Sequence, residues 1–329
     1  MKAAIVPEVH GTWTIKEIPT PEPGPGEVLI RIQASGLCYT DVHISEGHIP
    51  AQFPRTLGHE PVGDEVEVGA GVTKRRTGDR VGVPWVQDSC GRCEWCLRGK
   101  PMFCASQKGT GIQTQGSHAE FMLARAEATV LIPEGVSYEQ AAPIFCAGYT
   151  VYSGFRLSEP RPHDRIAVVG VGGLGHLALQ YAKAAGFETI AVTHSKDKEK
   201  SLRELGADHV VADGASLAKV GGADVILATG NSFPAVTDSI QALRPDGRVV
   251  LMGVGGQSIT IPTSILWVRG RVLGSSQNDP DQLYEALDWV AKGKVRVVTE
   301  TYPLDDIARA YERVKAGQVR YRAVILPRV

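Results

Sequence analysis

Hydrophobic and polar positions alternate over short stretches in the first half of the chain. Segments 27–34 (EVLIRIQA) and 78–85 (GDRVGVPW) have the two-residue period that is typical of half-buried β-strands. Clusters of Gly and Pro, such as PTPEPGPGE, separate these segments and favour turns. This pattern predicts a β-rich region up to about residue 146.

From about residue 161 the pattern changes to strands that alternate with helices. Short β-branched runs are followed by stretches whose apolar residues recur every three or four positions. The predicted strands are 165–170, 189–193, 223–230 and 248–253, and the predicted helices are 175–186, 198–207 and 233–247. Such alternation predicts an α/β fold with a parallel, doubly wound sheet.

The last part of the chain returns to a mixed pattern. Segments 280–294 and 305–318 have helical spacing, and 322–327 (RAVILP) has the composition of a buried strand. The length of 329 residues suits two domains. We predict a β-rich domain at 1–146, an α/β domain at 147–276, and a C-terminal segment at 277–329.

The charge balance excludes some classes of partner. Thirty-five basic residues against 36 acidic ones give a net charge of −1, so the composition does not predict binding to nucleic acid or to a membrane surface. No apolar run approaches the ~18–20 residues that span a bilayer, and the first residues lack the apolar core of a signal peptide. We therefore expect a cytoplasmic protein with reduced thiols, in which clustered cysteines favour metal binding or catalysis over disulfides.

A glycine-rich run lies at the start of the predicted α/β domain. GVGGLG, which includes Gly173 and Leu174, gives G-x-G-x-x-G at Gly170, Gly172 and Gly175. It directly follows a predicted strand and opens a predicted helix, which is the context that distinguishes a dinucleotide site from a common turn. The glycines would let the backbone approach a pyrophosphate at the helix N-terminus. A structural turn without a ligand is the alternative.

The end of the next predicted strand bears on the choice of dinucleotide. A carboxylate at this place binds the ribose 2′-hydroxyl of NAD. Here the strand ends in Thr193, His194, Ser195 and Lys196, and Asp197 comes a few residues late. Hydroxyl groups and a lysine suit a 2′-phosphate, so we predict NADP(H) in preference to NAD(H). The alternatives are that Asp197 reaches back or that these residues form a simple polar turn.

Four of the six cysteines lie in one short segment. Cys90, Cys93, Cys96 and Cys104 have the spacing C-x2-C-x2-C-x7-C. Disulfides between such near neighbours are sterically awkward. A ferredoxin-type cluster has a final gap of three residues followed by Pro, whereas Ala105 follows here. The spacing predicts a closed, tetrahedral structural Zn2+ site.

The other two cysteines are isolated. Taken alone, Cys38 and Cys146 would more often be small buried hydrophobic residues, and His59 a hydrogen-bonded core histidine. Their coexistence with a nucleotide-binding motif and a zinc-type cysteine cluster changes this interpretation. Two cysteines and one histidine can form an open zinc site that leaves one position for water or substrate.

Several motifs together resemble a known superfamily. GHEPVGDEVEVGAGV (58–72) matches G-H-E-x2-G-x5-G-x2-V, the zinc signature of the medium-chain dehydrogenases/reductases. GDRVGVPW, CGRCEWC, CAGYTVY and GVGGLG occur in the order found in that superfamily. Over essentially its whole length the chain is similar to zinc-dependent alcohol dehydrogenases, near the bacterial and cinnamyl-alcohol-dehydrogenase-like branches. The resemblance implies a GroES-like catalytic domain built from both chain ends, an inserted Rossmann domain, and a homo-oligomer, either dimer or tetramer.

The same resemblance implies metal-site roles for individual residues. Cys38, His59 and Cys146 would hold a catalytic zinc, and the four clustered cysteines a structural zinc, which gives two Zn2+ per chain. Glu60 matches the carboxylate that can approach the metal. Asp41 matches the acid that orients the ligand histidine.

Substrate-side roles follow in the same way, with some departures. Thr40 matches the hydroxyl that hydrogen-bonds the substrate oxygen, and His43 the outer end of a proton relay through the cofactor ribose. Trp85 matches an aromatic pocket wall, although a plain core role is also open. Tyr39 stands where relatives often have His or Arg, and His48 lies where many have Trp, so the pyrophosphate contact and pocket shape are not inherited.

The implied activity is reversible hydride transfer between an alcohol/aldehyde pair and the nicotinamide, with zinc as a Lewis acid. An NADP-type turn favours aldehyde reduction. One alternative is an NAD-dependent zinc polyol, formaldehyde or threonine-type dehydrogenase, although these usually carry pocket carboxylates or insertions. The other is a non-catalytic NADP(H)-binding sensor, which would be expected to have lost part of the Cys38, His59 and Cys146 set.

Overall fold

The computed structural model describes residues 1–253 and 258–327, apart from the side chain of Lys196. The chain divides into two compact units. The first contains Met1–Cys146, Asp279–Ala291 and Val297–Val329, and the second contains Ala147–Asn278 and Lys292–Arg296. The domain limits at 146/147 and 276/277 stay predictions of where each part folds independently.

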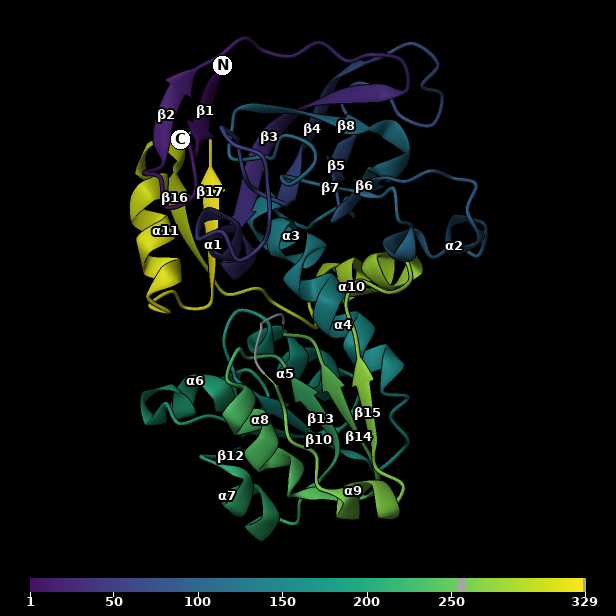
Figure 1. The fold of residues 1–329 in the computed structure, drawn as a ribbon, viewed down its shortest axis with the longest axis vertical. Helices are drawn as coiled ribbons and strands as arrows, with labels where there is room; N and C mark the ends of the chain where they lie inside the picture. The colour runs from purple at the N-terminus through teal and green to yellow at the C-terminus, as the bar shows by residue number, and fades with distance from the viewer. Residues whose placement is uncertain (254–257, 328–329) are drawn as a thin grey trace. The chain divides into compact units, whose positions relative to one another are not determined.

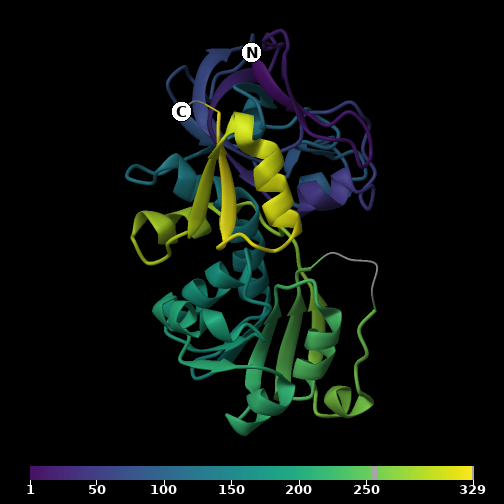
Figure 2. The same ribbon diagram turned by 90° about the vertical axis from the view of Figure 1, so that its left-hand side faces the viewer.

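A seven-stranded sheet forms the centre of the first unit. Its order is β16-β17-β3-β4-β5-β9, with β8 also paired to β3. The bounds are β3 (Glu27–Leu37), β4 (Glu60–Val68), β5 (Arg80–Gly82), β8 (Phe121–Arg125), β9 (Val130–Leu131), β16 (Thr299–Pro303) and β17 (Arg322–Leu326). Because β17 pairs antiparallel with β3, both ends of the chain build one sheet. Figures 1 and 2 show α11 (Ile307–Lys315) beside β16 and β17.

The alternation along β3 explains its place in this sheet. Val28, Ile30 and Ile32 are fully buried, whereas Arg31 and Gln33 are partly exposed and donate hydrogen bonds to Asp64 on β4. The buried side chains join Val81 and other apolar residues in one core. The remaining elements of the unit are β1 (Lys2–Ile5), β2 (Thr14–Glu17), α1 (Tyr39–Ser45), β6 (Val86–Asp88), α2 (Glu94–Leu97), η1 (Pro101–Phe103), β7 (Lys108–Gly109), η2 (Ala126–Ala128), α3 (Tyr138–Ala141), η3 (Ala142–Phe145), α10 (Asp281–Ala291) and η5 (Leu304–Asp306).

The second unit contains a six-stranded parallel sheet of order β12-β11-β10-β13-β14-β15. The strands are β10 (Arg165–Val169), β11 (Glu188–Val192), β12 (His209–Val211), β13 (Ala223–Ala228), β14 (Leu243–Leu251) and β15 (Arg271–Gly274). The helices are α4 (Ala147–Leu157), α5 (Gly175–Ala184), η4 (Lys196–Lys198), α6 (Glu199–Glu204), α7 (Gly214–Lys219), α8 (Phe233–Ile240) and α9 (Thr263–Trp267). Figure 2 shows α4 and α5 on one face of the sheet and α8 on the other. The predicted doubly wound sheet is confirmed, in the strand order of a dinucleotide-binding fold.

One predicted helix extends into a strand. The helix expected over 233–247 ends at Ile240, and β14 begins at Leu243. Leu243 is buried in the core of this unit and pairs with Ala223. Pro245 lacks the N–H that a helix interior needs. Burial of Leu243 in the sheet therefore overrides the helical spacing.

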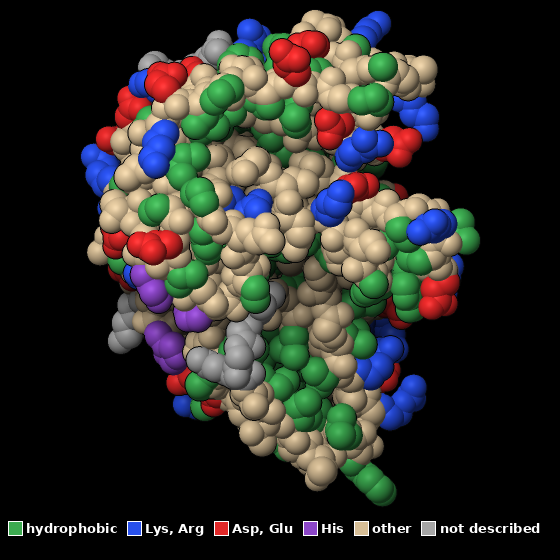
Figure 3. All heavy atoms as spheres, turned by 45° about the horizontal axis from the view of Figure 1, so that its top comes forward, with side chains coloured by type: hydrophobic (Ala, Val, Ile, Leu, Met, Phe, Trp, Pro, Cys, Tyr) green, Lys and Arg blue, Asp and Glu red, His purple; other side chains and the backbone are tan. Residues whose placement is uncertain are grey.

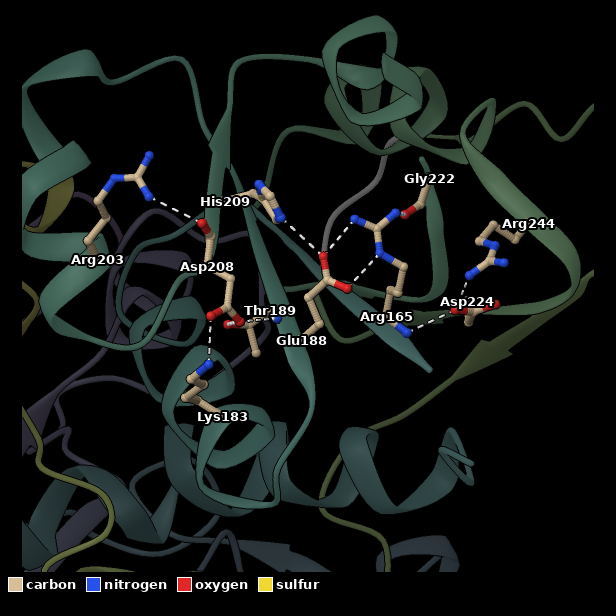
Figure 4. Close-up of polar contacts among 10 residues, drawn as sticks. All are labelled: Arg165, Lys183, Glu188, Thr189, Arg203, Asp208, His209, Gly222, Asp224 and Arg244. Atoms are coloured by element: carbon tan, nitrogen blue, oxygen red, sulfur yellow. Dashed lines mark hydrogen bonds and ion pairs between the residues drawn. The ribbon is translucent and has the colours of Figure 1, made fainter. Parts of the chain in front are cut away.

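The amino ends of the parallel strands are joined by charged side chains (Figure 4). Arg165, at the start of β10, donates two hydrogen bonds of 3.0 and 2.7 Å to the carboxylate of Glu188 on β11. His209 Nε2 on β12 lies 3.1 Å from the same carboxylate. The backbone N–H of Arg165 donates to Asp224 on β13. This network connects neighbouring strands at the amino-end edge of the sheet. Ligands bind at the opposite edge in such sheets, at the loops that follow the carboxyl ends of the strands.

Figure 3 shows basic and acidic side chains interspersed over one face of the molecule, in keeping with the near-zero net charge. Among the described residues, no helix combines the length and apolar character that a membrane crossing requires.

Candidate metal and cofactor sites

Three separate segments of the first unit bring the isolated cysteines and His59 together. Cys38 follows β3, His59 precedes β4, and Cys146 follows η3. Ligand atoms of these three residues and Glu60 all lie within 4.8 Å of one another. The two sulfur atoms are 4.0 Å apart, close to the edge of about 3.8 Å that a zinc tetrahedron with Zn–S bonds of about 2.3 Å would have. The residues present therefore fit a zinc ion.

The His59 ring is buried and oriented by Asp41. Its Nδ1 lies 3.4 Å from Asp41 Oδ1, and both side chains are almost completely inaccessible. Neither ring nitrogen makes a hydrogen bond within residues 1–253 and 258–327, and Nε2 lies 4.0 Å from Glu60 Oε1. Burial opposes the charged ring, but the Asp41 carboxylate raises the pKa of His59 above its usual value. A buried histidine with one nitrogen beside a carboxylate, and the other making no hydrogen bond to the described residues, is arranged as metal ligands are.

Asp41 also connects the segments that carry the ligands. Its Oδ2 accepts a 2.9 Å hydrogen bond from the Cys38 backbone N–H, and its Oδ1 accepts one of 3.2 Å from Gly58. Asp41 stands in the first turn of α1, so the helix fixes its direction. One fully buried carboxylate thus holds both the Cys38 loop and the His59 loop.

Sequence reasoning missed Arg322, which meets Glu60 in the same buried region. Its Nη2 donates to Glu60 Oε1, and its Nη1 lies 3.9 Å from Cys38 Sγ. Burial raises the pKa of Glu60 to about 7, although the charge of Arg322 opposes this rise. The two residues are 262 positions apart, so no local pattern indicates their contact. The one signal in the sequence is an arginine at the start of an otherwise apolar strand.

The remaining predicted substrate-side residues lie on α1 and next to His59. Thr40 Oγ1 is 3.7 Å from Cys38 Sγ, so it lies beside the metal ligands. Trp85 packs edge-on against the His59 ring, with centroids 5.5 Å apart. His43 is half-buried near the end of the helix. Burial, and then the neighbouring imidazole of His48, lower the pKa of His43.

The four clustered cysteines converge as their spacing predicts. Their sulfur atoms all lie within 4.8 Å of one another. Sγ of Cys96 is 3.9 Å from that of Cys90 and 3.6 Å from that of Cys93, which again matches the edge of a zinc tetrahedron. Backbone N–H groups of Arg92 and Cys93 lower the pKa of Cys90 to about 6. The set of four sulfurs fits a closed structural zinc site.

The glycine-rich turn connects β10 with α5 as expected. Gly170 has φ +87°, and a Cβ there would lie 2.6 Å from Cα of Gly230. A Cβ on Gly175 would lie 2.6 Å from the carbonyl oxygen of Gly170, whereas one on Gly172 would meet no described atom within 4 Å. The helix begins at Gly175, directly after Gly173 and Leu174. The turn is therefore tightly packed at Gly170 and Gly175, whereas the space next to the Gly172 Cα is free of described atoms. This free space fits a pyrophosphate.

The predicted 2′-phosphate residues follow β11. Ser195 N–H donates to Thr193 Oγ1 at 3.2 Å, and His194 is exposed. The side chain of Lys196 lies outside the described residues. Lys198, which sequence reasoning did not single out, donates from Nζ to the carbonyl of Val171 at 3.4 Å. It links the segment after β11 to the glycine-rich turn.

Family models, sequence relatives and solved structures that resemble this chain all point to the same group of proteins. Residues 24–134 match the model of the alcohol dehydrogenase GroES-like domain, and residues 173–292 match that of the zinc-binding dehydrogenases. An alcohol dehydrogenase of Geobacillus stearothermophilus is 39% identical over 334 residues, covering 99% of each chain. The solved alcohol dehydrogenase of Aeropyrum pernix has a TM-score of 0.91 at 32% identity and covers 99% of this chain and 100% of its own. A cinnamyl alcohol dehydrogenase of Sorghum bicolor has 0.90 at 30%, covering 98% and 96%.

Proposed function

Since this chain belongs to the zinc-dependent alcohol dehydrogenases of the medium-chain dehydrogenase/reductase superfamily, we propose that it reduces small aldehydes to alcohols, and reverses this reaction, with NADP(H) as the preferred cofactor. The observation that carries the proposal is the convergence of Cys38, His59 and Cys146 into one buried set of zinc-type ligands. A non-catalytic sensor would have no need to keep this set.

Individual residues have distinct roles in the proposed reaction. A zinc ion held by Cys38, His59 and Cys146 would supply a Lewis acid that polarises the substrate oxygen. The Thr40 hydroxyl, beside Cys38, hydrogen-bonds that oxygen and exchanges its proton. His43, farther along α1, is the outer end of the proton path.

The cofactor part of the proposal rests on the end of β11. Thr193 and Ser195 offer hydroxyl groups where an NAD-binding chain has a carboxylate, and the sequence adds Lys196. Lys198 adds a cation beside the glycine-rich turn. The test compares kcat/KM with NADPH and with NADH. A clear preference for NADPH is expected, and equal values would contradict this part of the proposal.

A metal count separates the enzyme from the sensor. We expect two zinc ions per chain, one at the Cys38 set and one at the four clustered cysteines. Cys38→Ser should abolish turnover and remove one zinc while leaving the thermal midpoint nearly unchanged. Cys104→Ser is the matched control, because it should remove the other zinc. Turnover retained in Cys38→Ser would refute the assigned catalytic metal site.

A panel of aldehydes, primary and secondary alcohols and polyols, assayed with both cofactors, would identify the substrate class. Efficient polyol oxidation with NAD would favour the NAD-dependent alternative. We further propose a homo-oligomer, dimer or tetramer, and a cytoplasmic location, where the six free cysteines would stay reduced. Sedimentation analysis of the zinc-loaded protein tests the first, and localisation of the native protein in its host tests the second.

A further inference from the structure

A histidine on α1 and one just after that helix are in direct contact. His43 Nδ1 and His48 Nδ1 lie 3.3 Å apart, and their rings meet edge to face with centroids 5.5 Å apart. The backbone causes this contact: the N–H groups of His48 and Ile49 both donate to the carbonyl of His43, at 2.8 and 3.1 Å. Gly47 permits the reversal with φ +75°, a conformation that other residues rarely adopt.

The two rings differ in their access to water. His43 is half-buried, and its ring also meets that of Tyr39 at a steep angle, with centroids 5.0 Å apart. His48 is exposed. A proton that arrives at His43 therefore has an exposed imidazole within hydrogen-bond distance, 3.3 Å from Nδ1. The contact gives the half-buried ring a path to solvent.

We propose that His48 extends the proton path by one residue, accepting at Nδ1 the proton that His43 releases from its own Nδ1. In alcohol oxidation His43 gains a proton at Nε2 and loses one at Nδ1, while His48 gains one at Nδ1 and loses one from Nε2 to water. One proton reaches solvent, both rings end neutral, and no electrons move. In aldehyde reduction the same steps run in reverse. This inference rests on the proposed function, because it assigns the step after His43.

The neighbouring charged groups leave this path open. Glu46, on the same segment, accepts 2.8 Å hydrogen bonds from Lys315 and Tyr311 of α11 and lies 3.4 Å from His10. The Glu46 carboxylate is therefore already occupied by these three partners. Tyr39 also contacts the His43 ring, and the charge of Cys38 acts on it. Burial and His48 both lower the pKa of His43, which favours transfer of its proton outward.

The test compares His48→Gln with His43→Gln in the zinc-loaded enzyme. Proton release in a single turnover is followed with an indicator dye in weak buffer, from pH 6 to 9. His48→Gln should slow release roughly 3- to 10-fold, a fraction of a full acid–base contribution. Its zinc content and KM should be unchanged, and added imidazole should restore the rate. His10→Gln, an exposed histidine bonded to Glu46, is the matched control and should behave as the unmodified enzyme.

The outcomes separate this inference from the proposed function. Slow release in His43→Gln but not in His48→Gln would overturn the inference and leave the relay intact. Normal release in both variants would remove the relay itself and the inference with it. A slow His48→Gln variant that imidazole does not rescue would indicate a structural role and also overturn it. Independently of activity, histidine NMR titration should show a higher pKa for His43 in His48→Gln, and an unchanged value would contradict the coupling of the rings.

Discussion

Cys38 Sγ and Cys146 Sγ lie 4.0 Å apart although the two residues are 108 positions apart along the chain. The hydrogen bond between the two thiols lowers the pKa of Cys38 and raises that of Cys146, so the pair by itself favours a single negative charge. A divalent cation would allow both sulfurs to be thiolates, because it compensates their mutual repulsion. The pair is therefore better explained as a metal site than as two packed thiols.

The first prediction concerns the carboxylate that holds this site together. Asp41→Asn keeps the side-chain size but removes the negative charge that faces His59. It also weakens the hydrogen bonds from the backbone N–H groups of Cys38 and Gly58. We expect zinc affinity at the Cys38 set to fall by roughly 10- to 100-fold, as for other residues that orient metal ligands. Competition with a chromophoric chelator measures this affinity.

Asp64→Asn is the matched control for Asp41→Asn. Asp64 is a half-buried carboxylate of the same unit, bonded to Arg31, Gln33 and Tyr138 and not to any metal ligand. Its loss should lower the thermal midpoint without releasing zinc. Equal zinc affinity in the two variants would contradict the role assigned to Asp41.

Local patterns in the sequence predicted the parts of this structure that depend on neighbours in the chain. The two-residue period located β3, and the strand–helix alternation located the parallel sheet, because burial on one side imposes these periods. The predicted end of α8 was wrong because Leu243 is buried in the core as part of the sheet, which the local spacing does not show. The spacing of the four clustered cysteines was sufficient to predict their convergence.

Contacts over long separations could not be predicted in this way. The Arg322–Glu60 pair joins the last strand to the start of β4, and no spacing within either segment indicates it. The contact between His43 and His48 is short-range, yet it depends on a turn at Gly47 whose direction the sequence does not specify. The motifs in the sequence identified the residues of the sites. The charged residues that surround them could be identified only from the fold.

The second prediction concerns a buried carboxylate away from both metal sites. Glu65 on β4 is fully inaccessible, and burial raises its pKa to about 7, with Arg75 Nε at 3.9 Å opposing the rise. Between about pH 4.3 and 7 the native state keeps a proton that the unfolded chain has lost, so stability falls as the pH rises through this window. Glu65→Gln removes this loss.

Urea unfolding at pH 5 and pH 8 checks the prediction for Glu65. The variant should gain about 1–3 kcal/mol relative to the unmodified protein between pH 5 and pH 8. Glu67→Gln, an exposed position on the same strand, is the matched control and should show no such gain. A stability difference for Glu65→Gln that does not change with pH would refute the burial argument.

The third prediction separates two glycines of the same turn. In Gly175→Ala the new Cβ would lie 2.6 Å from the carbonyl oxygen of Gly170, so we expect a loss of about 1–3 kcal/mol in stability. In Gly172→Ala the Cβ would meet no described atom within 4 Å, so the fold should persist. Because that methyl group would occupy the space expected for the pyrophosphate, NADPH should bind roughly 10-fold more weakly. Thermal melts and NADPH fluorescence titrations measure the two effects, and normal NADPH affinity in Gly172→Ala would place the pyrophosphate elsewhere.

The last prediction tests the cofactor preference at the end of β11. Thr193 is the first residue after that strand, where a carboxylate would bind the two ribose hydroxyls of NAD. In Thr193→Asp the new negative charge should repel a 2′-phosphate and bind a ribose, which shifts the ratio of kcat/KM for NADPH over NADH by roughly 10-fold or more towards NADH. Thr193→Ser keeps a hydroxyl and should leave the ratio unchanged. If Thr193→Asp lowers both values equally, the side chain at this position does not face the ribose, and the preference must come from other residues after β11.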